Sequence, residues 1–160
     1  MMTVRLIVLG KLKEEYLRQA CGEYQKRLQS ICRLQIVELT PYRLPDNPSA
    51  AQIEDALQRE ADEILKLIPP SAKVFSLCIE GKMLSSEQFS AELEKTAVSG
   101  TGCAVFIIGS SFGLSDSIKR QSHMRLSMSP MTFPHQLARV MLLEQLYRAF
   151  QISHGGKYHK

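Results

Sequence analysis

Hydrophobic residues along the chain form two patterns: short continuous runs, and longer stretches in which they recur every three or four positions. The continuous runs predict buried strands at residues 4–9, 34–39, 74–79 and 103–108, with a short fifth strand near 126–128. The periodic stretches predict helices over residues 13–28, 49–68, from 85 onward and 134–152, with a short helix after residue 113.

Polar residues at fixed spacing mark where two of these helices begin. Ser49 is followed by Gln52, and Ser85 by Gln88, which is the spacing of a capping box. Pro134 suits the first turn of the last helix, because a backbone N–H group has no helical partner at that position.

Strands that alternate with helices predict an α/β fold with a mostly parallel sheet and helices on both faces. The length of 160 residues fits a single domain, residues 1–160. Ligands of open α/β sheets bind beyond the carboxyl ends of the strands. We therefore expect a binding site in the loops that follow Ile79, Ile108 and Met128.

Composition narrows the class of protein. Hydrophobic residues make up 44% and charged residues 22%, as in ordinary globular proteins. We find no signal peptide and no apolar run of membrane-spanning length, so we expect a cytoplasmic protein without a membrane partner. The four cysteines form no C-x-x-C pair, which favours buried free thiols and no metal site (Cys21, Cys32, Cys78 and Cys103).

The net charge of +4 lies entirely in the second half of the chain. Residues 1–80 carry 11 basic and 11 acidic residues, whereas residues 81–160 carry 9 and 5, together with all four histidines. A one-sided basic region is typical of a protein that binds a polyanion, and RNA fits better than a membrane because no amphipathic basic helix is present. A solvated basic surface without a partner explains the charge equally well.

The turn after the first strand reads Gly10-Lys11-Leu12-Lys13, which matches neither a dinucleotide-binding nor a phosphate-binding glycine motif. A second glycine loop, residues 109–113, follows the fourth strand and fits two functions. As a G-x-S-x-G elbow it would make Ser111 the nucleophile of a serine hydrolase, with His135 as base and Asp116 as a poorly placed acid. As a ligand loop it would let backbone amides approach a cofactor closely; a plain tight turn also remains open.

The strongest signal is the segment from Ser127 to Phe150, which contains Thr-Phe-Pro-His, Arg-Val and Glu-Gln-Leu-Tyr-Arg-Ala in succession. With Leu-Cys-Ile-Glu-Gly-Lys at 77–82, the loop at 108–113 and the terminal Tyr-His-Lys, this segment closely resembles the SPOUT-class methyltransferases of bacterial large-subunit ribosomal RNA. The resemblance implies S-adenosylmethionine-dependent methylation of N3 of a pseudouridine in 23S ribosomal RNA, on the assembled ribosome. It also implies a homodimer and a trefoil knot, within about residues 74–152, followed by a basic tail, residues 153–160.

The same resemblance assigns site residues. The cofactor would be held by Leu77, Gly109, Met128, Ser129, Pro130, Met131, Thr132 and Phe133. Leu77 and Met128 are also explained by core packing alone. The RNA would be contacted by Arg125, Lys157, Tyr158, His159 and Lys160, although by itself the tail reads as a mobile basic end.

His135 and Arg139 are the candidates for the chemistry. His135 lies in the first turn of the last helix, where the helix dipole disfavours imidazolium, so it can serve as the base for the N3 proton. A hydrogen bond at the helix terminus explains it equally well. Arg139, one turn further on, would clamp a phosphate or stabilise the developing anion.

One position departs from the family pattern. Ser110 stands where the family's loop usually has a second glycine. If that position requires positive φ, serine would add strain of about 1 kcal/mol or more and weaken cofactor binding. A ribosome-binding protein that has lost catalysis is therefore a third hypothesis beside the methyltransferase and the hydrolase.

Overall fold

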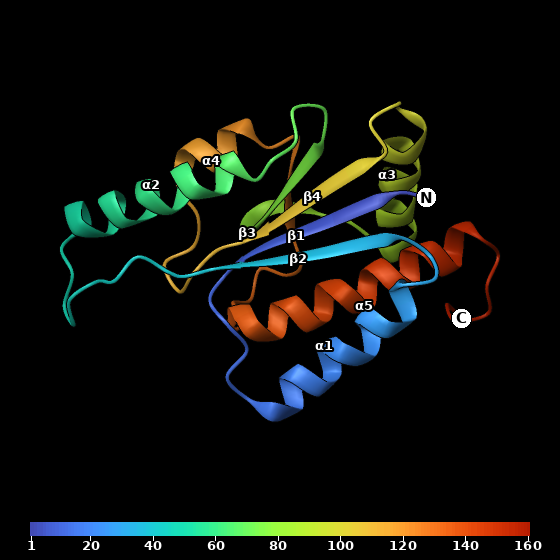
Figure 1. Ribbon diagram of the computed structural model, residues 1–160, viewed down its shortest axis with the longest axis horizontal. Coiled ribbons are helices and arrows are strands. Elements are labelled where there is room, and N and C mark those ends of the chain that lie inside the picture. The colour runs from blue at the N-terminus through green and yellow to red at the C-terminus, as the bar shows by residue number, and fades with distance from the viewer.

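The computed structural model describes all residues, 1–160, as five strands and five helices in strict alternation (Figure 1). The elements are β1 (Thr3–Leu9), α1 (Glu15–Leu28), β2 (Arg33–Leu39), α2 (Ala50–Lys66), β3 (Lys73–Met83), α3 (Ser86–Val98), β4 (Cys103–Ile108), α4 (Asp116–Gln121), β5 (Met124–Ser127) and α5 (His135–Ser153). The predicted order of elements is confirmed throughout.

The strands form one sheet in the order β2-β1-β4-β3-β5, and every neighbouring pair is parallel. The central strand β4 is buried at all six positions, which is why its sequence is continuously apolar. The sheet is therefore parallel throughout, which goes further than the mostly parallel sheet that the sequence predicts.

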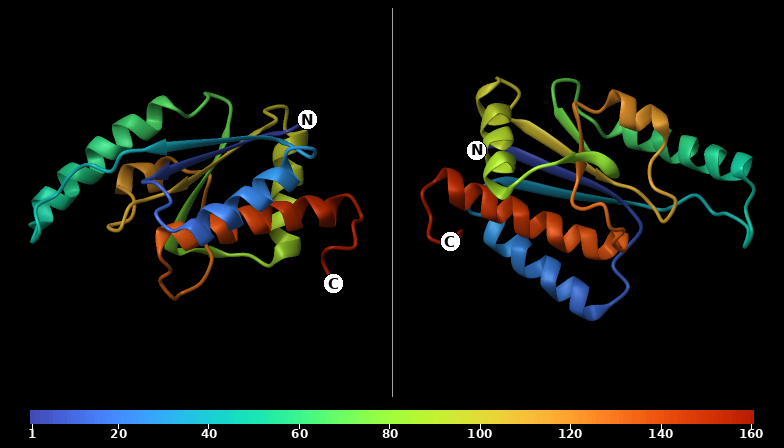
Figure 2. Two further views of the ribbon diagram at one scale, coloured as in Figure 1. Left: turned by 60° about the horizontal axis from the view of Figure 1, so that its bottom comes forward. Right: turned by 180° about the vertical axis from the view of Figure 1, so that it is seen from behind.

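Helices cover both faces of the sheet, as predicted. On one face, α1, α3 and α5 pack over a core that includes Leu6, Phe106 and Leu142 (Figure 2). On the other face, α2 and α4 cover a smaller core built around Ile7, Ile64 and Ile118. The alternation of β1 side chains between these two cores is the period-two geometry of a strand.

Both predicted capping boxes are present. Ser49 Oγ accepts a hydrogen bond from the Gln52 N–H at 3.2 Å, and Gln52 Oε1 accepts one from the Ser49 N–H at 2.8 Å. Ser85 and Gln88 make the same pair of bonds at the start of α3. Pro134 lies one position earlier than expected, at the N-cap of α5, and the helix begins at His135.

The strand bounds differ from the sequence prediction at β3 and β5. β3 continues to Met83, and its register against β5 shifts between Leu77 and Lys82, which both pair with Leu126. At the shift Gly81 lies so close to β5 that a Cβ atom there would stand 2.7 Å from the Arg125 carbonyl oxygen. Hydrophobic periodicity does not reveal this irregularity, because residues 78–81 mix apolar and polar side chains and none of them is fully buried.

The cysteines are all free thiols, as expected; three are buried and Cys78 is half-buried. None of the helices combines the length and the apolar character that crossing a membrane would require. The trefoil knot implied by the family resemblance stays a prediction.

Candidate cofactor and RNA site

A cavity of about 890 Å³ opens at the carboxyl ends of β3, β4 and β5. Three segments line it: residues 77–80 after the regular part of β3, residues 108–114 after β4, and residues 126–135 between β5 and α5. These are the loops in which the sequence predicted a binding site. They lie together because the carboxyl ends of parallel strands meet at the same edge of the sheet.

Most of the predicted cofactor residues lie in the wall of this cavity, namely Leu77, Gly109, Met128, Ser129, Met131, Thr132 and Phe133. His135 lies there too. Pro130 belongs to the same loop but does not line the cavity, and Arg139 also lies outside it. The geometry thus brings together residues from three separate stretches of the chain.

The glycine loop is a tight turn in which the Gly113 N–H donates to the Ser110 carbonyl at 2.9 Å. Gly113 has a φ of 84°, and a Cβ atom on Gly109 would lie 2.3 Å from the Gly113 carbonyl oxygen. Glycine is therefore required at both ends of the turn. Ser110 has negative φ, as do all other non-glycine residues, so the strain considered for this serine is absent.

The hydrolase hypothesis is not supported. Ser111 and His135 line the same cavity, but Asp116 does not, and no hydrogen bond links the three residues. Asp116 is the first residue of α4 and is exposed. The loop serine that does meet a carboxylate is Ser110, whose hydroxyl donates to Glu60 Oε1 at 3.3 Å.

The segment before α5 folds into a polar turn. The Ser127 hydroxyl donates to the Ser129 carbonyl at 3.1 Å, and Ser129 Oγ accepts from the Met131 N–H at 3.0 Å. Met131 is 72% exposed at the cavity wall, and Phe112 on the opposite loop is 49% exposed. Exposed apolar side chains beside backbone polar groups are typical of a site for a flat, partly polar ligand.

His135 is neutral near pH 7. Partial burial lowers its pKa below the usual value, and the positive charges of Arg139 and Lys13 act in the same direction. The sequence argument predicted a neutral ring but assigned it to the helix dipole. The side chain makes no hydrogen bond at the helix terminus, so that alternative is not supported. Its ring faces Gly10, where a Cβ atom would stand 3.6 Å from Nε2.

Arg139 does not occupy the position that the sequence argument gave it. Its guanidinium is 4% exposed, donates to Glu38 Oε2 at 2.8 Å and to the Gly10 carbonyl at 3.0 Å, and has no partner at Nε. Near it the Gln136 side chain accepts from the Lys13 N–H at 2.8 Å. A buried guanidinium engaged with its own chain cannot clamp an RNA phosphate, so the expected contact is wrong for this conformation.

Sequence reasoning missed the two charged residues in the cavity wall. Lys119 on α4 and Glu80 in the irregular part of β3 both line the cavity and form an ion pair with a distance of 2.5 Å. The hydrogen bond from Lys119 lowers the pKa of Glu80. No sequence signal links these residues, because they are 39 positions apart and each belongs to a locally polar segment.

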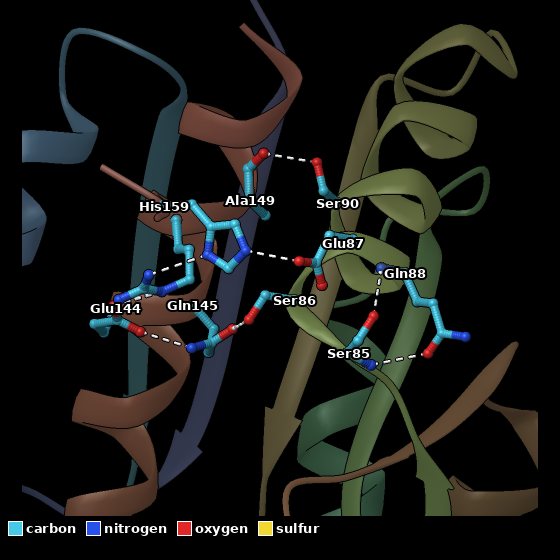
Figure 3. Close-up of polar contacts among 10 residues, drawn as sticks. Ser85, Ser86, Glu87, Gln88, Ser90, Glu144, Gln145, Ala149 and His159 are labelled. Carbon is cyan, nitrogen blue, oxygen red and sulfur yellow. Dashed lines mark hydrogen bonds and ion pairs between the residues drawn. The ribbon is translucent and has the colours of Figure 1, made fainter. Parts of the chain in front are cut away.

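The carboxyl-terminal tail is docked rather than mobile. His159 Nε2 lies 2.7 Å from Glu87 Oε1 at the start of α3, as Figure 3 shows, and the Tyr158 hydroxyl donates to Glu144 at 3.2 Å. Lys157 and Lys160 are exposed. The tail lies against α3 and α5 and does not line the cavity, and neither does the exposed Arg125.

Comparison with known proteins identifies the family. The family model described as "Predicted SPOUT methyltransferase" matches residues 2–159. Ribosomal RNA large subunit methyltransferase H of Clostridium acetobutylicum is 47% identical over 159 residues, which cover 99% of this chain and 100% of that relative. The protein of the same name from Bacillus pumilus is 44% identical over the same shares of the two chains.

Solved structures support the fold alone. A probable methyltransferase from Bordetella pertussis Tohama I superposes with a TM-score of 0.57 at 14% identity, over 93% of this chain and 94% of that one. A probable methylase family protein from Haemophilus influenzae Rd KW20 gives 0.55 at 13% identity, over 98% and 70%. The family model and the close relatives span almost the whole chain, and the motifs of its last third lie around one cavity. The chain therefore belongs to the SPOUT methyltransferase family.

Proposed function

We propose that this protein transfers a methyl group from S-adenosylmethionine to N3 of a pseudouridine in 23S ribosomal RNA, in the cytoplasm. The observation that carries the proposal is the cavity at the strand ends, whose wall combines three loops of a SPOUT methyltransferase. Relatives that match nearly all of the chain bear the name ribosomal RNA large subunit methyltransferase H.

The residues present fit the proposed cofactor. Leu77, Met128 and Phe133 offer apolar contact for an adenine ring, and the glycine at 109 keeps side-chain atoms away from the turn. A cavity of about 890 Å³ is in the usual range for ligands of this size. When bound, S-adenosylmethionine supplies a methyl group on a positively charged sulfur.

The protein must also help the N3 proton to leave. His135 is the residue we assign to this step, because it lies in the cavity wall, is neutral and has no hydrogen-bond partner of its own. A base with these properties accepts a proton at Nε2 or Nδ1 without first losing one. Positioning of the nucleobase against the methyl group should supply most of the remaining rate acceleration.

Arg139 takes a different role in this proposal from the one its sequence position indicated. Its contacts with Glu38 and the Gly10 carbonyl fix the first turns of α5 against the loop after β1. It therefore positions His135, and its charge helps to keep that imidazole neutral.

RNA binding is assigned to the basic residues outside the cavity. Arg125, Lys157 and Lys160 are exposed and would contact phosphates, while Tyr158 and His159 would stack on or bond to unpaired bases. A chain of this size with a net charge of +4 has little surface for free RNA, which favours the assembled ribosome as substrate. The resemblance to the SPOUT family favours a homodimer as the active form.

The binding-only hypothesis loses its physical basis, because Ser110 has negative φ and imposes no strain on the loop. The decisive experiment is transfer of labelled methyl from S-adenosylmethionine to ribosomes that lack the modification, with the label mapped by nuclease digestion and mass spectrometry. We expect label on N3 of one pseudouridine of 23S ribosomal RNA.

A glycine pair provides the control. Gly109→Ala places a Cβ atom 2.3 Å from the Gly113 carbonyl oxygen and should abolish transfer, whereas Gly22→Ala adds a Cβ atom that meets nothing within 4 Å. Gly22→Ala should therefore be as active as the wild type. Folded wild-type protein that leaves the ribosomes unlabelled would disprove the proposed function.

A further inference from the structure

Glu60 is a buried carboxylate that the proposed chemistry does not use. It lies on α2 at helical spacing from Ile53, Leu57 and Ile64, so it occupies a position in the apolar stripe of that helix. It is 7% exposed and forms no ion pair with any Lys, Arg or His. A buried acid without a cation is costly, and its presence calls for a specific role.

Two hydrogen bonds show what Glu60 holds. Oε2 accepts from the Tyr42 N–H at 2.9 Å, and Oε1 accepts from the Ser110 hydroxyl at 3.3 Å. Burial raises the pKa of Glu60, while the hydrogen bonds from Tyr42 and Ser110 act in the opposite direction. The carboxylate thus joins α2 to the segment after β2 and to the glycine loop of the cavity.

The glycine loop depends on this contact more than on any other side chain. The bond between Ser110 and Glu60 is the only side-chain hydrogen bond that residues 109–113 make with the rest of the molecule. Ser111, Phe112 and Gly113 are exposed, and the bond between Gly113 and Ser110 closes the turn only on itself. Where the turn lies over the cavity is therefore governed by its two ends and by Ser110.

We propose that Glu60 is a positioning residue which, through Ser110, holds the glycine loop in the conformation that binds the cofactor. The inference rests on the proposed function and adds to it a residue from the amino-terminal half of the chain. A loop held in its bound conformation loses less entropy when the ligand binds, so Glu60, which does not line the cavity, raises affinity through Ser110, which does. Serine at position 110 then contributes a tether, which a glycine there could not.

Substitutions separate this role from a general effect on stability. Ser110→Ala removes the tether, and we expect cofactor binding about tenfold weaker, the upper range for one ordinary hydrogen bond, because 3.3 Å is long for a bond to a carboxylate. Glu60→Ala should weaken binding to the same extent, and the double variant should be no weaker than either single one. Glu60→Gln should bind within about twofold of wild type, because its oxygen can accept from Tyr42 and its amide can donate to Ser110.

Arg59→Ala is the matched control. Arg59 is the neighbour of Glu60 on α2 and places its guanidinium 5.1 Å from the centre of the Tyr42 ring, but it makes no contact with the glycine loop. Its loss perturbs the same helix and the same segment after β2. We expect its cofactor affinity to equal that of the wild type.

The measurement is the dissociation constant of S-adenosylmethionine and of S-adenosylhomocysteine by calorimetry, on variants whose folding is verified by circular dichroism. With ribosomes as substrate, the Ser110→Ala variant should show a raised KM for the cofactor and an unchanged kcat at saturation. Wild-type affinity in Ser110→Ala, or equal losses in Ser110→Ala and Arg59→Ala, would overturn the inference. A wild-type protein that binds neither compound would instead refute the proposed cofactor.

Discussion

The two ends of α5 are held in place by different physical means. At its amino-terminal end the Arg139 side chain is 4% exposed and bonds to the backbone of Gly10 and to Glu38, whose side chain is 37% exposed, so the guanidinium is buried although its carboxylate partner reaches solvent. At its carboxyl-terminal end Arg148 pairs with Glu144 at a distance of 2.9 Å from Nε, with side chains 25% and 18% exposed. The arginine of each pair is thus buried at one end of the helix and partly hydrated at the other.

The difference matches the tasks assigned to the two ends. Breaking the contacts of a buried guanidinium leaves a desolvated charge and is costly, whereas a partly hydrated arginine can exchange its partner for water at lower cost. The amino-terminal end therefore keeps His135 fixed in the cavity wall. In the proposed function, the carboxyl-terminal end would let Tyr158 and His159 leave Glu144 and Glu87 to contact the RNA.

The largest effect should come from removing the buried arginine. Arg139→Ala leaves a cavity and removes the bond to the Gly10 carbonyl, while Glu38 stays solvated, and we expect a loss of about 3 kcal/mol in the free energy of unfolding. Arg148→Ala, the matched variant on the same helix, should cost below about 1 kcal/mol. Urea denaturation of both variants makes the comparison, and equal losses would show that the two ends do not differ.

The next effect concerns His135. His135→Gln should lower the rate of methyl transfer by about 100-fold, the lower range for a general base, while cofactor affinity stays near that of the wild type. Because the folded pKa of His135 is lowered, the wild-type rate should rise with pH through a value below about 6.5 and then level off. The same shift makes the folded state less stable as the pH falls below about 6.5. If the His135→Gln variant transfers methyl groups at the wild-type rate, His135 takes no part in the reaction.

A smaller effect is expected at the docked tail. Tyr158→Phe removes the hydrogen bond to Glu144 and should cost about 0.5–1 kcal/mol of stability, without any effect on cofactor binding. Burial raises the pKa of Tyr158 to about 12, and the negative charge of Glu144 acts in the same direction. Its contribution to stability is thus complete below about pH 10 and is lost as the pH rises towards 12.

Ultraviolet difference titration checks this assignment directly. Of the five tyrosines, one should ionise later than the others in the wild-type protein, and that late step should be missing in Tyr158→Phe. A variant that retains the late step would show that the tail is not docked on α5.

The smallest effect is expected at Glu87, at the outer rim of the tail contact. The hydrogen bond from His159 lowers the pKa of Glu87, so this contribution to stability is present above about pH 4.3 and is lost as the pH falls through the lower folded value. Glu87→Gln should leave stability unchanged at low pH, where the wild type is also protonated, and reduce it slightly near pH 6. Denaturation curves of the variant and the wild type at these two pH values give the difference in stability. A variant as stable as the wild type at both pH values would show that the contact is absent in solution.

Local sequence patterns determined most of the fold. Strand and helix periodicity, the capping boxes at Ser49 and Ser85, and the alternation of elements predicted a mostly parallel sheet covered on both faces, because these signals depend on neighbours a few positions apart. The strand-end rule located the cavity, and the motif around Thr132 and His135 identified the family.

Only the tertiary structure decided what each charged side chain meets. Arg139 bonds to groups 101 and 129 positions away, and Glu60 meets Ser110 across 50 positions, so no local pattern could reveal these pairs. The one signal in the sequence was an acid in the apolar stripe of α2, which shows that Glu60 is buried but not what it binds. Periodicity specifies which face of an element is buried, whereas the partners of a buried charge are specified by how distant elements pack together.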